Sequence, residues 1–458
     1  MRSQSVQING KKITFKPPAR STGGMVPVKK SYRNISGLKS PDWVRDAILY
    51  EIYVRNFSGS GDFAGVIERL PELKELGVNT LWLMPVHPIG VKERKGKLGS
   101  PYAIKDYFGL NPEYGSEDDF RRLVTESHKS GMRIILDLVI NHSANDHIMI
   151  NEKIHWWQRD RQGYPVRRVS FWSDVVDFNY QSCDLWNYLV DMMKYWVEKF
   201  DIDGFRCDVA GMVPPEFWQY AIPQVKNVKP DLFFLAEWED PELHLNAFHA
   251  TYNWTFYFKI LDVAQGKCSA DEMLNAFLFK YHTFPQNSVR LNFIENHDEK
   301  RAMKLFGKQK QRLFSSLIFM LPGLPLIYNG QEAGYSSFLS LFNRRPMRWR
   351  NVDREVYRHY RDLIALRKRI PALRAGTVAK IDLQVPEQVI GFFRKQGNNF
   401  ALCLFNFSDQ SATINTEIPD KFGWAVLSSY PDSVAYTVKE NRLSVALHPR
   451  QYFVLWCE

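Results

Sequence analysis

Short apolar runs and amphipathic segments alternate along the chain from residue 48 onward. The apolar runs predict buried strands, and they cover residues 48–54, 80–84, 133–139, 203–208, 232–237, 251–256, 289–294 and 324–328. Between them, apolar residues recur at helical spacing, which predicts helices over residues 63–76, 116–130, 185–200, 215–225 and 355–369. Strands that alternate with helices are typical of parallel βαβ units, and eight such strands predict an α/β fold of the TIM (β/α)8 barrel type.

The alternation breaks at two places. Residues 142–180 are polar, aromatic and irregular, and this stretch is too long for a simple loop, so it predicts a small inserted domain after the third strand. After Pro371, short alternating strands at 389–394, 400–405, 442–447 and 452–456 predict a C-terminal antiparallel β-sandwich domain over residues 371–458. The barrel is therefore expected to comprise residues 41–141 and 181–370.

The residues before the first strand are basic. The chain has a formal net charge of +10, and much of this charge lies in residues 1–40, which we interpret as a solvated N-terminal arm. No nucleic-acid recognition motif accompanies the arm, so we expect no nucleic-acid partner. No run approaches the ~18 apolar residues of a membrane-spanning helix, so we also expect no membrane partner.

The cysteines and the N-terminus bear on the compartment. The five cysteines are odd in number and scattered, without a CxxC pair, which argues against a disulfide framework and against a zinc site. The first residues are polar and lack the apolar stretch of a signal peptide. Both observations favour a cytoplasmic protein.

Three acidic residues stand where apolar, strand-like segments end: Asp208, Glu237 and Asp298. The carboxyl ends of all strands in a β/α barrel open onto one face, so these distant side chains are expected to meet there. Two carboxylates that flank one bond are what glycoside hydrolysis requires, and a third can stabilise the charged transition state. The strand ends therefore predict a glycosidase site.

Several motifs resemble those of glycoside hydrolase family 13, the α-amylase family. The main four are DLVINH at residues 137–142, GFRCD at 204–208, LAEW at 235–238 and ENHD at 295–298. Further similar segments are GDFAG at 61–65, PYAIKDY at 101–107 and PLIYNGQE at 325–332. Their order and their spacing along a predicted barrel make this resemblance specific, and it extends over nearly everything after residue 45.

The resemblance implies a role for each site residue. Asp208 would be the nucleophile of a covalent glycosyl-enzyme intermediate, Glu237 the general acid and base with a raised pKa, and Asp298 the stabiliser of the transition state. Arg206 lies two residues before Asp208, on the same side of the strand, and is expected to lower the pKa of Asp208. The substrate-binding residues would be Arg206 together with Tyr102, His142, His297 and Trp238, with Asp137 orienting His142 and Arg206.

The resemblance also implies a calcium ion held by Asn141 and Asp177. Residues 177–179 (DFN) are similar to a short family segment, and oxygen ligands suit calcium. Two protein ligands fall short of the six to eight that calcium takes, so the alternative is that Asn141 and Asp177 only hydrogen-bond the insert to the barrel. Many relatives carry Lys-His where this chain has Gly211 and Met212, and His where it has Ser100.

These features predict a retaining α-glucan hydrolase that cleaves α-1,4 bonds in maltooligosaccharides or starch-type glucans. An α-glucosidase and a glucanotransferase share the same intermediate and remain alternatives. From a different class, a barrel that only binds carbohydrate would lack one of the three carboxylates, and all three are present. The sequence leaves the substrate length and the oligomeric state open.

Overall fold

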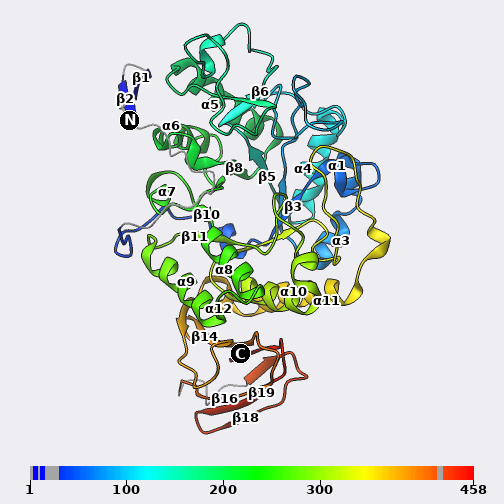
Figure 1. Ribbon diagram of the computed structural model, residues 1–458, viewed down its shortest axis with the longest axis vertical. Coiled ribbons are helices and arrows are strands. Elements are labelled where there is room, and N and C mark those ends of the chain that lie inside the picture. Colours follow the sequence, from blue (N-terminus) through cyan, green and yellow to red (C-terminus); the bar gives the residue numbers. More distant parts are fainter. Residues whose placement is uncertain (1–3, 9–10, 16–29, 420–426, 458) are drawn as a thin grey trace.

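The computed structural model describes residues 4–8, 11–15, 30–419 and 427–457. Its centre is a closed barrel of parallel strands in the order β10-β11-β12-β3-β4-β5-β8-β9 (Figure 1). The strands are β3 (Leu49–Ile52), β4 (Thr80–Leu83), β5 (Arg133–Leu138), β8 (Gly204–Cys207), β9 (Phe233–Ala236), β10 (Ala250–Tyr252), β11 (Val289–Asn292) and β12 (Leu324–Tyr328). Each overlaps one of the predicted apolar runs, so the predicted TIM barrel is confirmed.

Helices follow the strands and form the outer layer of the barrel. They are α1 (Val54–Phe57), α2 (Phe63–Ile67), α3 (Leu70–Leu76), α4 (Glu117–Lys129), α5 (Cys183–Phe200), α6 (Pro215–Lys226), α7 (Leu243–Asn246), α8 (Trp254–Ala264), α9 (Ala270–Thr283), α10 (Ala302–Met320), α11 (Arg354–Arg369) and α12 (Pro371–Ala375). Short 3-10 helices are η1 (Asp42–Asp46), η2 (Ile154–Trp156), η3 (Ala210–Met212) and η4 (Trp349–Asn351). Ser116 caps α4 through a capping box with Asp119, as its place before an acidic turn indicates.

Two predicted elements differ in the structure. The helix predicted over residues 63–76 is two helices, because Pro71 has no N–H to bond to the preceding turn and therefore starts a new helix, α3. The strand predicted over residues 251–256 ends at Tyr252, and α8 begins at Trp254. Trp254 and Tyr257 pack on one core at helical spacing, and a short apolar run does not distinguish this from a strand.

Along the barrel strands, the side chains that point inward change from apolar to charged. Leu49, Ile135 and Leu235 belong to one buried apolar cluster inside the barrel. Successive side chains of a strand point to opposite faces, so the residues two positions later also point inward. These are Glu51, Asp137 and Glu237, all buried. The period of two thus places an apolar layer in the barrel and a charged layer towards the carboxyl ends of its strands.

Two further regions flank the barrel. The insert between β5 and α5 contains β6 (His142–Ala144) and β7 (Val175–Asp177), which pair antiparallel. At the other end of Figure 1, the C-terminal region forms a sheet in the order β13-β14-β15-β20-β17 and a second sheet in the order β16-β19-β18. These strands are β13 (Thr377–Lys380), β14 (Val389–Gln396), β15 (Asn399–Asn406), β16 (Ala412–Glu417), β17 (Leu427–Tyr430), β18 (Tyr436–Lys439), β19 (Arg442–Leu447) and β20 (Tyr452–Cys457). They enclose an apolar core, as expected for an antiparallel sandwich.

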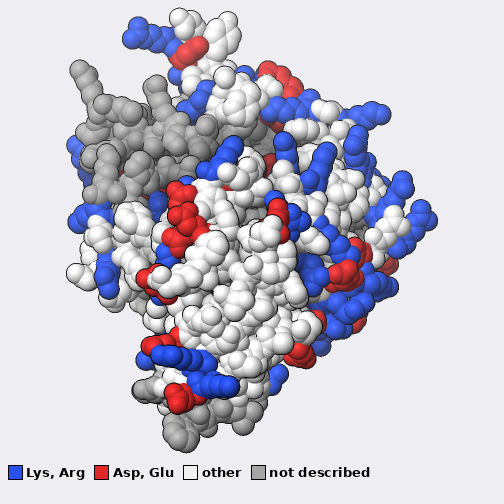
Figure 2. Space-filling view, turned by 60° about the horizontal axis from the view of Figure 1, so that its bottom comes forward, with Lys and Arg blue, Asp and Glu red and all other residues white. Residues whose placement is uncertain are grey.

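The predicted basic arm is described in part. It contains a hairpin of β1 (Gln4–Ile8) and β2 (Lys11–Phe15), which the sequence reading did not predict, whereas residues 1–3, 9–10 and 16–29 lie outside the described residues. Further along, the backbone N–H of Tyr32 donates to Thr283 at the end of α9. Lys and Arg side chains also gather along the right-hand edge in Figure 2, so the positive charge is not confined to the arm. Among the described residues, no helix is long and apolar enough to cross a membrane.

Candidate active site

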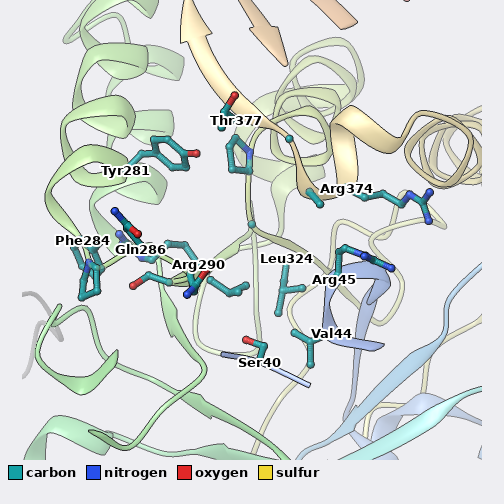
Figure 3. A pocket seen from close by; sticks show the side chains of 18 of the residues that line it. Ser40, Val44, Arg45, Tyr281, Phe284, Gln286, Arg290, Leu324, Arg374 and Thr377 are labelled. Atoms are coloured by element: carbon teal, nitrogen blue, oxygen red, sulfur yellow. The ribbon is translucent and has the colours of Figure 1, made fainter. Parts of the chain in front are cut away.

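Two large cavities lie at different places on the barrel. One of about 680 Å³ lies among η1, α9, α12 and the first residues of β11 and β12, where the C-terminal region meets the barrel (Figure 3). Two of the arginines that line it form ion pairs, Arg290 with Glu239 at 2.8 Å and Arg374 with Asp46 at 2.9 Å. The other cavity, of about 290 Å³, lies where the strands end and contains the predicted carboxylates; its lining includes Tyr102, His142, Asp208, Glu237, His297 and Asp298. This second cavity is the candidate active site.

Arg206 lies beneath the candidate site and joins three carboxylates. Its guanidinium Nη1 donates to Oδ1 of Asp137 at 2.8 Å and to Oδ1 of Asp208 at 2.9 Å. Nη2 lies 2.9 Å from Oε1 of Glu237, as an ion pair without hydrogen-bond geometry. The parallel register explains this meeting, because Arg206 is paired with Asp137 on β5 and with Leu235 on β9, two residues before Glu237.

Burial dominates the protonation of Asp208 and Glu237. It raises the pKa of Asp208 to about 6 and that of Glu237 to about 7, although Arg206 opposes both shifts. We predicted that Arg206 lowers the pKa of Asp208; it acts in that direction, but burial and the neighbouring carboxylates Asp137 and Asp298 outweigh it. The predicted raised pKa of Glu237 is confirmed. At neutral pH, Asp208 is mainly ionised and Glu237 can give or accept a proton.

His297 forms a second charged group beside the first. Its Nε2 lies 2.7 Å from the Tyr102 hydroxyl and 3.3 Å from Oδ2 of Asp298, while its Nδ1 bonds to Glu51. Burial opposes a charge on this ring, but Asp298 and Glu51 together raise the pKa of His297 to about 9. His297 therefore donates from both nitrogens, and the Tyr102 hydroxyl passes the chain of hydrogen bonds on to Asp137 at 3.1 Å.

Glu51 was missed by the sequence reading. It lies on β3 within the apolar run ILYEIYV and is fully buried, with Oε2 lacking a hydrogen-bond partner. A charged residue at an inward position of a predicted barrel strand was the available signal, because such residues are almost never buried without a partner. Its partner, His297, is far away in sequence.

The remaining predicted residues occupy different positions around the site. His142, on β6, packs against Trp172 with ring centroids 5.2 Å apart, and burial lowers the pKa of His142 to about 4, so its ring is neutral. Asp137 orients Arg206, as predicted, but its other hydrogen bonds go to Trp82 and Tyr102 rather than to His142.

Tyr102 and Trp238 also differ from each other in how they are placed at the site. Tyr102 stacks on the ring of His297 with an interplanar angle of 17°, so one face of Tyr102 is covered by protein. Trp238 is buried against Gly211, where a Cβ atom would approach the indole to 2.1 Å. This contact explains why glycine stands at position 211, and it places Trp238 behind Glu237 as a packing residue.

The rim of the cavity comes from segments that the sequence reading did not assign to the site. Lys95 forms an ion pair with Asp174 at 3.0 Å and donates to the carbonyl of Phe171 at 2.9 Å. On the other side, the N–H of Leu98 donates to the carbonyl of Phe342 at 3.0 Å. Lys95, Phe171, Asp174 and Phe342 all line the cavity, so three loops meet at its mouth.

Asn141 and Asp177 are brought together, as the calcium prediction requires. Their side-chain oxygens, however, both accept hydrogen bonds from Arg168. Elsewhere among the described residues, no group of three or more His, Cys, Asp or Glu side chains is arranged to hold a metal ion.

Comparisons with known proteins identify the family of the chain. The family model described as "Alpha amylase, catalytic domain" matches residues 51–168 and 151–351. The crystal structure of a maltogenic α-amylase, AmyB, from Thermotoga neapolitana is 34% identical, with a TM-score of 0.83 over 90% of this chain and 99% of that one. An α-amylase, MalA, from Haloarcula japonica is 28% identical over 82% of this chain and 57% of its own length.

An intracellular maltogenic amylase from Bacillus subtilis is 29% identical over 73% of this chain and 63% of its own. The chain thus spans less than two thirds of the length of these two curated relatives. The family match covers more than half of the chain and overlaps every strand of the barrel. The chain therefore belongs to the α-amylase family, glycoside hydrolase family 13.

Proposed function

We propose that the protein is a retaining α-glucan hydrolase that cleaves α-1,4 bonds in maltooligosaccharides by double displacement. The observation that carries this proposal is the position of Asp208 and Glu237 on one buried guanidinium, that of Arg206, at the wall of a cavity. A shared guanidinium favours the short separation of about 5–5.5 Å that retention needs over the wider spacing of inverting enzymes. Membership of the α-amylase family and the similarity to maltogenic amylases support the same substrate class.

In the first step, the two carboxyl groups have different roles. Glu237, protonated, gives its proton to the glycosidic oxygen while Asp208, ionised, attacks the anomeric carbon. The bond from that carbon to the leaving oxygen breaks, and an ester between sugar and Asp208 forms. In the second step Glu237 takes a proton from water, and the water oxygen replaces Asp208 at the anomeric carbon. The pKa of about 7 for Glu237 suits both directions of proton transfer.

The groups around the carboxylates hold the sugar and its developing charge. Asp298 is half-exposed at the cavity and has a free side for sugar hydroxyls, whereas Arg206 is covered and acts by fixing Asp208 and Glu237. His297, held as an imidazolium, uses both of its N–H groups on protein and so positions Tyr102 and Asp298, while His142 adds a neutral donor from β6. Preorganised donors of this kind stabilise the oxocarbenium-like transition state more than the ground state.

Incubation with maltoheptaose tests the proposal. We expect shorter oligosaccharides whose newly formed reducing ends are α-configured when first observed by NMR. Products longer than the substrate would make the protein a glucanotransferase, and glucose alone would make it an α-glucosidase. Binding without turnover would leave a carbohydrate-binding barrel and overturn the proposal.

The cavity and the relatives suggest the substrate size and the compartment. A cavity of about 290 Å³ with a rim built from three loops suits short oligosaccharides better than a long polymer lying across the barrel. The similarity to an intracellular maltogenic amylase supports a cytoplasmic location, in agreement with the cysteine pattern. A comparison of kcat/KM for maltotriose and for soluble starch tests the preference for short substrates, and we expect a higher value for the trisaccharide.

A further inference from the structure

We propose that the guanidinium of Arg168 takes the place of a structural calcium ion between the insert and the barrel, so that this site is assembled without metal. The proposal concerns how the active site is held in place, and it is independent of which glucan the protein cleaves. The sequence left two alternatives for Asn141 and Asp177, namely that they bind calcium or that they only link the insert to the barrel by hydrogen bonds. In the structure they link the insert to the barrel, and they do so through a cation, the guanidinium of Arg168.

Arg168 binds oxygen atoms from three separate segments. Its Nε donates to Oδ2 of Asp177 on β7 at 2.8 Å, and its backbone N–H donates to the same oxygen at 3.0 Å. Its Nη1 donates to the backbone carbonyl of Met212 in η3 at 2.9 Å, and its Nη2 donates to Oδ1 of Asn141, which follows β5. The side chain of Arg168 is 16% exposed and that of Asp177 is 1% exposed, so the pair is largely shielded from water.

A carboxylate, an amide oxygen and a backbone carbonyl are the kinds of ligand that calcium takes in proteins. Here all three converge on one guanidinium. Calcium would need six to eight oxygens, and the three present are already hydrogen-bonded to a cation. A divalent ion added beside Arg168 would also be repelled by it, with Asp177 as the one carboxylate bonded to the cluster. These three oxygens therefore suit the guanidinium of Arg168, and they cannot bind calcium at the same time.

The connection reaches the residues of the active site. Asn141 is the neighbour of His142, and its amide nitrogen lies 3.0 Å from Nδ1 of that ring. Met212 ends the short helix η3, which begins two residues after Asp208. Arg168 thus fixes the start of the insert and the turn after β8 relative to each other. Arg168 is a positioning residue in this account, because it does not line the cavity.

Melting temperature and metal content, measured without substrate, test the proposal. The wild-type protein, dialysed and analysed by mass spectrometry for metals, is expected to contain no stoichiometric calcium. Its melting temperature is expected to change by less than about 1 °C between EDTA and millimolar CaCl₂, since an ion that does not bind the folded state cannot stabilise it. Stoichiometric calcium in the wild-type protein, or a melting temperature that falls by several degrees in EDTA, would overturn the proposal.

Variants of Arg168 sharpen the test. Arg168→Ala is expected to lower the melting temperature by roughly 5 °C, because it leaves buried acceptors and a buried carboxylate unpaired. Calcium is expected to raise the melting temperature of Arg168→Ala and not that of the wild type, because the three freed oxygens can then bind an ion whose remaining ligands are water. Arg161→Ala, which removes an exposed Arg of the same insert, is the matched control and should melt like the wild type with and without calcium.

Arg168→Lys keeps the fold testable if the alanine variant does not fold. One ammonium cannot reach all the acceptors of the planar guanidinium, so an intermediate loss of stability is expected. An Arg168→Lys protein that is no more stable than Arg168→Ala, or an Arg168→Ala protein that calcium leaves unchanged, would contradict the idea that Arg168 occupies a cation position. These measurements need no substrate. The proposal for Arg168 can therefore be refuted while the proposed hydrolysis stands, and the proposed hydrolysis can be refuted while the proposal for Arg168 stands.

Discussion

Arg206 in the barrel and Arg394 in the C-terminal region are both completely buried, and their partners differ in kind. Arg206, at the carboxyl ends of the strands, is paired with Asp137, Asp208 and Glu237. Arg394, on β14 of the C-terminal region, donates to the backbone carbonyls of Met320, Gly376 and Thr377. Carboxylate partners raise the pKa of Arg206 against the effect of burial, whereas burial lowers the pKa of Arg394 to about 10.

The difference shows two uses of a buried cation. Arg394 connects the end of α10 with α12 and the C-terminal sheet, so it joins regions by satisfying carbonyls. Arg206 gathers carboxylates that would otherwise repel one another, so it creates a site whose charges can react. The first use requires only that donors and acceptors match, and the second makes the protonation of the partners depend on the cation.

Asp208→Asn should reduce activity more than any other single substitution. We expect kcat on maltooligosaccharides to fall by about 10⁴-fold or more, because the amide cannot form the glycosyl ester. The melting temperature should not fall, since the change removes one of several buried like charges around Arg206. Activity assays and thermal unfolding check this. Wild-type turnover in the variant would exclude Asp208 as the nucleophile.

The two arginines can be compared directly as Arg206→Met and Arg394→Met. The first should lower kcat by about 10³-fold and destabilise the fold by about 3–5 kcal/mol, because three buried carboxylates lose their counter-ion. The second should cost about 1–3 kcal/mol through unsatisfied carbonyls, with kcat per folded molecule unchanged. Urea unfolding and assays at matched folded fractions separate these effects. Equal losses of kcat in both variants would remove the distinction between the two sites.

The pH dependence of the wild-type rate should report the site around Arg206. The nucleophile must be ionised and the acid protonated, so kcat/KM should fall about tenfold per pH unit below about 6 and above about 7. Arg394→Met should show the same profile as the wild type, and a shifted optimum in that variant would contradict the comparison.

The smallest expected effect is that of Glu51→Gln, which keeps the shape of the side chain and removes its charge. The pKa of His297 is raised to about 9, so the stability that Glu51 lends to His297 is present below about pH 6.5 and is lost as pH rises through 9. The wild type should therefore melt higher than the variant at pH 6, and this difference should vanish near pH 10.

The same Glu51→Gln variant should lose roughly tenfold in kcat/KM at neutral pH, because a neutral ring is a weaker partner for Asp298. Thermal unfolding over a pH series, with Glu113→Gln as a control at the half-exposed partner of Arg55, checks both expectations. A difference in melting temperature that stays constant with pH would show that Glu51 acts by packing alone.

The sequence allowed the barrel and the meeting of Asp208, Glu237 and Asp298 to be predicted for a simple reason. Strand ends in a parallel barrel share one face, and the inward side of each strand follows from a period of two, so position along a strand fixes position in space. The same reasoning placed Arg206 beside Asp208. It failed for residues 251–256, where the apolar run is too short to distinguish the start of α8 from a strand.

The partners of Glu51 and Arg168 could not be predicted from the sequence, because they are distant along the chain or lie in irregular segments. Glu51 needs the loop after β11 to bring His297 over the barrel, and Arg168 needs the insert to fold back onto Asn141 and Met212. The contacts of loops depend on the whole fold rather than on a local period. The contacts of Glu51 and Arg168 therefore required the three-dimensional structure, whereas the three carboxylates and Arg206 could be predicted from the sequence.

The proposed double displacement requires that Asp208 forms a covalent bond to the sugar. The most direct measurement is intact-protein and peptide mass spectrometry after reaction with a 5-fluoro α-glucosyl fluoride, which forms such an intermediate and slows its breakdown. We predict one added glycosyl group, located on the peptide that contains Asp208 and absent from Asp208→Asn. Turnover of maltoheptaose to β-configured products without any adduct, or an adduct on another residue, would contradict the account.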